Sequence, residues 1–74
     1  MNVRLIRHIV HGSDRVCSDA MANADLRTLT QAAAELERKK IRMRLPLLRR
    51  EVEERLLLAG ARMRKLREQE PAAK

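Results

Sequence analysis

Two helical stripes of apolar residues run along this chain in different phases, and Pro46 stands where they meet. Both stripes step by three and four residues, which is the spacing of an α-helix that buries one narrow face. The first consists of Leu26, Leu29, Ala33, Leu36, Lys40, Met43 and Leu47, and the second of Leu45, Val52, Leu56, Ala59, Met63 and Leu66. A change of phase between two stripes constrains the fold more than any other feature of the sequence.

This change of phase excludes a single straight helix with one buried face. Counting by sevens from Leu29 gives Leu36, Met43, Arg50, Leu57 and Arg64. The two arginines cannot line a dry contact, and the apolar count restarts two residues later, at Leu45. Two residues correspond to about 200° of helical rotation, so the two apolar faces would point in nearly opposite directions. We therefore expect an all-α fold with two coiled-coil-like helical segments, at about 25–45 and 46–70.

Pro46 is the strongest helix breaker in the chain. A proline inside a helix costs about 3 kcal/mol, whereas it costs little as the first residue of a helix. No Gly, Asn, Asp or Ser lies beside it, so the chemistry for a tight reversal is poor. The sequence favours a kink or a short break at Pro46 over an antiparallel hairpin, although a hairpin would also reconcile the two faces. Gly60 is interpreted as a weak point of the second segment rather than as a site of close helix approach.

Residues 1–11 have the pattern of a short basic amphipathic helix. Its apolar side consists of Val3, Leu5, Ile6, Ile9 and Val10, and its polar side of Arg4, Arg7, His8 and His11. Three hypotheses fit it: a helix packed on the rest of the chain or a partner, a non-structural extension before a start at Met21, and an organelle-targeting segment. Membrane-surface contact by this helix is a minor fourth. The pattern of residues 12–24 indicates a linker or weak helix, with Ser18 or Asn23 as a cap for the next helix, and that of residues 71–74 a frayed tail.

The chain has 74 residues and no aromatic side chain, so its core must come from aliphatic residues and methionine. Chains of this size bury only about 60% of their unfolded surface and often need a partner. We therefore expect a non-enzymatic subunit, adaptor or regulator that binds a protein partner or a second copy through its apolar seams. The predicted seam residues are Leu26, Leu29, Leu36, Met43, Val52, Leu56, Ala59, Met63 and Leu66.

A second function is indicated by charge, because the chain carries a formal net charge of +7. Residues 38–50 hold seven positive charges and no negative one. On a continuous helix, one broad face would carry Arg38, Lys39, Arg42, Arg49 and Arg50. Such a face could grip the phosphates of a nucleic acid, with little reading of sequence. Helical pairs at i,i+4, Glu35 with Lys39 and Glu51 with Arg55, are expected to add stability.

Other chemistry has little support in the sequence. His8 and His11 lie three residues apart, but a metal site needs a further ligand in fixed geometry, so no metal or other cofactor is expected. No pattern suggests a catalytic pocket, and no apolar run reaches the length of a membrane span. The single cysteine, Cys17, excludes an internal disulfide and fits a reducing, intracellular, cytoplasmic location unless residues 1–11 direct the chain to an organelle.

Overall fold

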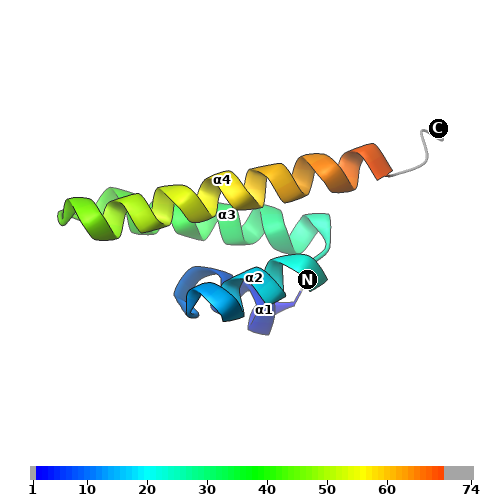
Figure 1. Cartoon of the computed structure of the whole chain (residues 1–74), viewed down its shortest axis with the longest axis horizontal. Helices are drawn as coiled ribbons and strands as arrows, with labels where there is room; N and C mark the ends of the chain where they lie inside the picture. The colour runs from blue at the N-terminus through cyan, green and yellow to red at the C-terminus, as the bar shows by residue number, and fades with distance from the viewer. Residues whose placement is uncertain (1, 70–74) are drawn as a thin grey trace.

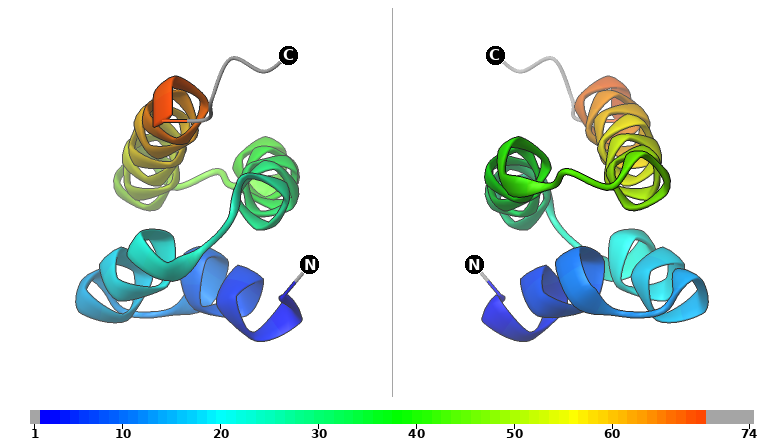
Figure 2. Two further views of the ribbon diagram at one scale, coloured as in Figure 1. Left: turned by 90° about the vertical axis from the view of Figure 1, so that its right-hand side faces the viewer. Right: turned by 90° about the vertical axis from the view of Figure 1, so that its left-hand side faces the viewer.

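The computed structural model describes residues 2–69, which form four α-helices and no strand. The helices are α1 (Val3–His11), α2 (Asp14–Asn23), α3 (Leu26–Arg42) and α4 (Pro46–Gln69). They form two layers, an α3–α4 hairpin and an α1–α2 pair that lies across one side of it (Figures 1 and 2). The all-α prediction is confirmed, and two helical segments are separated just before Pro46. They form an antiparallel hairpin, so the preference for a kink or short break over a hairpin is wrong.

The chain reverses at residues 43–45, and α3 and α4 pack side by side in opposite directions (Figure 1). Helix α3 ends in a turn whose last bond runs from the Met43 N–H to the Lys40 carbonyl, 3.1 Å. Pro46 is the first residue of α4, where its missing N–H and fixed φ cost little. The reversal needs no glycine, because none of the three residues that separate the helices has a positive φ.

The hairpin turns the two apolar stripes toward the interior of the same chain. Of the nine predicted seam residues, Leu29, Leu36, Val52 and Ala59 are buried, and Leu26 is half-buried. The remaining four, Met43, Leu56, Met63 and Leu66, are partly buried and pack against this core. The seams are thus covered within the chain, and the nine seam residues leave little exposed surface for another molecule to contact.

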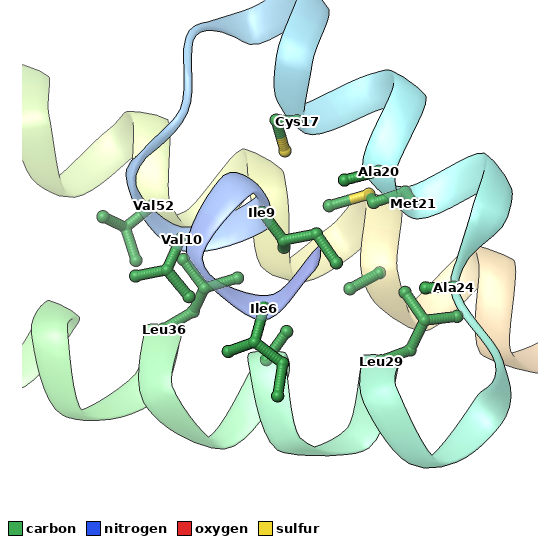
Figure 3. Packing of buried hydrophobic residues seen from close by; sticks show 12 residues of the cluster. Ile6, Ile9, Val10, Cys17, Ala20, Met21, Ala24, Leu29, Leu36 and Val52 are labelled. Atoms are coloured by element: carbon green, nitrogen blue, oxygen red, sulfur yellow. The ribbon is translucent and has the colours of Figure 1, made fainter. Parts of the chain in front are cut away.

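Helices α1 and α2 complete the core. Ile6, Ile9 and Val10 of α1 are buried, and Ile9 lies in the middle of the cluster between the two layers (Figure 3). Cys17 and Met21 of α2 reach the same cluster, which also contains Ala20 and Ala24. Of the two alternatives predicted for residues 12–24, the helix holds for residues 14–23 and the linker does not, because α2 contributes apolar side chains that only the folded chain can bury.

Short polar side chains begin the first three helices. Asn2 caps α1, Ser13 caps α2 and Asp25 caps α3, each by accepting a hydrogen bond from a backbone N–H three residues ahead. The cap of α3 is therefore Asp25 rather than Ser18 or Asn23. Asn23 instead donates to the Asp19 carbonyl at 2.8 Å, within α2.

The two glycines have opposite surroundings, which gives a matched pair of substitutions. A Cβ on Gly12 would lie 2.5 Å from the His8 carbonyl oxygen and 2.7 Å from a methyl of Val16, whereas one on Gly60 would meet nothing within 4 Å. We expect Gly12→Ala to destabilise the fold by about 1–3 kcal/mol through overpacking, and Gly60→Ala to stabilise it by up to about 1 kcal/mol. Urea denaturation gives the free energy of unfolding of both variants. Equal changes in that free energy would contradict the tight packing around Gly12 and the open space around Gly60.

The cap of α3 predicts a pH dependence. Hydrogen bonds with the Thr28 side chain and backbone lower the pKa of the Asp25 carboxyl from its ordinary value of 3.8. A lowered pKa means that the cap's contribution is complete above 3.8 and is lost as pH falls through the folded-state value. Asp25→Asn has no such titration, so the stability difference from the parent chain should change between about pH 5 and about pH 2. Parallel denaturation curves across that range would contradict this role.

Candidate interaction surface

The exposed aliphatic side chains gather at the end of the hairpin where α3 passes into α4. Four large aliphatic residues within eight positions are exposed to 82% at Ile41, 63% at Leu45, 77% at Leu47 and 42% at Leu48. This end of the hairpin projects past α1 and α2 (Figure 1), although Leu48 at its inner border shares a cleft with Val10 and His11 at the end of α1. The sequence pattern places Leu45 and Leu47 in the buried stripes, and the structure contradicts both assignments.

Five arginines lie near these aliphatic residues along the chain. Arg38, Arg42, Arg44, Arg49 and Arg50 are all exposed. Together with the four aliphatic residues they form the surface that we call the hairpin end. Four of the five predicted phosphate-binding residues belong to it, but they come from two antiparallel helices rather than from one continuous face.

Lys39, the fifth predicted phosphate-binding residue, is used inside the fold. Its ammonium group donates to the Val10 carbonyl at 3.2 Å, and the side chain is half-buried. Neither Glu35 with Lys39 nor Glu51 with Arg55 forms an ion pair in the described part of the chain, so these two predictions are wrong.

Acidic residues stand at the base of the hairpin end rather than on it. Glu35 shares a cleft with Arg38 and Arg42, and Glu53 pairs with Lys40 at 3.3 Å. The first turn of α4 contains no acidic residue, although carboxylates are favoured at that end of a helix. Arg49 and Arg50 therefore add their charges to the positive end of the α4 dipole. The outermost part of this surface is strongly positive.

Arg55 of α4 binds the end of α1, on the side of the hairpin that α1 and α2 cover. Its guanidinium donates to the carbonyls of Ile9 and Gly12 at 2.9 and 2.6 Å, with a longer bond of 3.4 Å to Val10. It also lies 3.4 Å from Asp14, and only 16% of the side chain is exposed. The positive group satisfies carbonyls that the end of α1 leaves free and opposes the negative end of its dipole.

Arg62 has a similar position seven residues later. It donates to the Ala22 carbonyl at 3.2 Å, near the end of α2. Two arginines at heptad spacing on α4 therefore hold the ends of α1 and α2. No sequence signal marks this role, since both arginines resemble ordinary solvated charges on an amphipathic helix.

The other polar candidates lack a built site. Burial raises the pKa of the Cys17 thiol, which keeps it protonated and packed in the core. Within residues 2–69, no three His, Cys, Asp or Glu side chains lie close enough to hold a metal ion, and His8 and His11 do not gain a third ligand. A membrane span is likewise absent from the described helices, none of which combines the needed length and apolarity.

The contribution of Arg55 to stability can be tested by replacing its guanidinium group with an apolar side chain. We expect Arg55→Met to destabilise the fold by about 2–3 kcal/mol, because buried hydrogen bonds to a charged group are lost and the carbonyls of α1 remain unpaired. Arg49→Met, at an exposed position, should change stability by less than about 0.5 kcal/mol. Urea denaturation compares the two variants. Equal effects would show that the contacts of Arg55 contribute nothing beyond those of a surface charge.

Comparison with protein-family models, with curated proteins and with solved structures finds no match to this chain. The interpretation of the hairpin end therefore rests on its own chemistry.

Proposed function

We propose that this protein is a non-enzymatic helical interaction protein whose hairpin end docks on an anionic lipid surface. The observation that supports this function best is the mixture of four exposed aliphatic residues and five exposed arginines in an acid-free segment at one projecting end. The sequence predicts an interaction protein, but through the apolar seams. Because those seams pack within the chain, the proposal places the contact at the hairpin end instead.

The position of the hairpin end favours a lipid surface over a protein groove. The aliphatic side chains stand at a projecting reversal between two helices and are exposed, so we expect them to enter an apolar medium rather than to receive a side chain. A bilayer interface accepts such groups to a depth of about 5–10 Å. Arginine side chains around them can keep their aliphatic stems in the interface while the guanidinium groups contact lipid phosphates.

Nucleic acid is the second candidate partner, because the same arginines would also attract a phosphate backbone. Arg38, Arg42, Arg49 and Arg50 are exposed at one end of the molecule, although they lie on two helices rather than on the one continuous face that the sequence predicts. Phosphate contacts would leave Ile41 and Leu47 without a role, however. The chain also has no aromatic side chain on which an unpaired base could stack. These features favour lipid.

Vesicle co-sedimentation tests the proposal. At about 100 mM salt, we expect the protein to bind phosphatidylcholine vesicles that contain about 30% phosphatidylserine and not pure phosphatidylcholine vesicles, because each arginine near an anionic surface adds about 1 kcal/mol. The double variant Ile41→Ser and Leu47→Ser should weaken binding about tenfold or more, since two large aliphatic groups no longer enter the interface. Both positions are highly exposed, so the fold should be retained.

Val3→Ser is the matched control, because Val3 is an exposed aliphatic residue of α1 that lies outside the hairpin end. It should bind anionic vesicles as the parent chain does. Equal binding by the double variant and the parent would overturn the role of the aliphatic residues. Salt-sensitive binding to duplex DNA or RNA at about 50 mM salt, without binding to anionic vesicles, would favour the nucleic-acid function instead.

A further inference from the structure

The outward face of α4 carries a heptad pattern that the fold does not use. Six residues at alternating steps of four and three are all exposed: Arg50, Glu54, Leu57, Ala61, Arg64 and Glu68. This set is called the outer stripe. The inward residues Val52, Ala59 and Leu66 fall on the opposite side of the same helix, so the outer stripe faces away from the core. At its edges, Leu57 borders a cleft with Glu37 of α3, and Glu54 borders one with Asp14 of α2. It spans about 27 Å of helix.

The charges of the outer stripe are complementary to the same stripe read in reverse. When two copies of α4 run antiparallel and cross at position 59, Arg50 faces Glu68 of the other copy and Glu54 faces Arg64. Leu57 faces Ala61 at the centre. Every charged position of the stripe therefore meets an opposite charge, and the apolar positions meet each other, which is the layer pattern of an antiparallel coiled coil.

The residues beside the stripe fit the same register. In an antiparallel pair, the residues that flank the stripe on one side face residues of the same heptad position in the other copy. Leu58 therefore lies against Leu58 of the other copy, and Glu51 lies against Lys65. Leu57 and Leu58 are 75% and 57% exposed, which is unusual for adjacent leucines in the middle of a helix. A parallel pair would instead place like charges together at Arg50, Glu54, Arg64 and Glu68.

We infer that the outer stripe is a self-association surface, on which a second copy of this chain packs its α4 in antiparallel orientation about a two-fold axis near position 59. Such a contact is isologous, since each copy contributes the same surface. One helix face buries little area, so the pair is a weak, transient dimer rather than an obligate one. The inference does not depend on the proposed function, because Glu54, Leu57 and Arg64 lie outside the hairpin end.

Charge reversal tests the pairing by sedimentation equilibrium up to about 1 mM protein at about 100 mM salt, where exposed charges are screened beyond about 10 Å. In Glu54→Arg, two arginines face each other at both ends of the contact, and in Arg64→Glu, two glutamates do. Each single variant should weaken association about tenfold. The double variant restores opposite charges and should associate within about threefold of the parent.

The matched controls carry the same charge changes away from the stripe. Asp19→Arg on α2 and Arg27→Glu on α3 are exposed positions, and each should leave the association constant within about twofold of the parent. These controls separate the specific pairing from the effect of net charge. A parent chain that stays monomeric at about 1 mM would overturn the inference, and so would a double variant no better than the singles.

A cross-link reports the register itself. In a chain with Cys17→Ala, the variant Leu58→Cys brings two thiols together across the two-fold axis, and oxidation should yield a disulfide-linked dimer. Arg50→Cys is the control, because position 50 faces position 68 and lies far from its own equivalent. A disulfide-linked dimer formed equally by both variants would contradict the antiparallel register.

Discussion

The antiparallel packing of α3 on α4 is the contact on which the rest of this structure depends. It brings two apolar stripes of different phase to one side of a two-helix layer, where α1 and α2 can cover them. In a chain without aromatic residues, no single pair of helices offers enough apolar area to be stable alone. Four short elements share one core of aliphatic residues, methionine, alanine and one cysteine. Ile9 of α1 is fully buried within this shared core.

Cations from the hairpin complement this core. Lys39 and Arg55 come from different helices, yet both donate to the carbonyls that end α1, and Arg62 does the same for α2. A free carbonyl at a buried helix end would be costly, so these contacts explain how two short helices remain ordered against the hairpin. They also explain why part of the basic composition has no bearing on partners. Charges of this kind are a structural component of the fold.

Two regions of the remaining surface differ in their chemistry. The hairpin end is aliphatic and uniformly positive, whereas the outer stripe of α4 alternates in sign. An antiparallel pair of α4 helices would place the two hairpin ends at opposite ends of a dimer. Arg50 belongs to both regions, so its charge would be shared between them. The two proposals connect one fold to an anionic surface and to its own copy, and apart from Arg50 they use separate residues.

The sequence by itself determined the helical class, the two apolar stripes and their separation at Pro46, because periodicity and proline chemistry are local properties. It could also locate the basic segment that contains Arg38 and Arg50. Only the tertiary structure decided that the chain reverses at residues 43–45 and that residues 14–23 form a core helix. Only the tertiary structure decided that the Arg55 side chain binds the carbonyl groups at the end of α1, and that Ile41 stays exposed to solvent. Contacts between segments far apart in the chain decide how it turns, which distant side chain caps a helix and which helix face is buried. A local sequence pattern does not show which of several such arrangements has the lowest free energy.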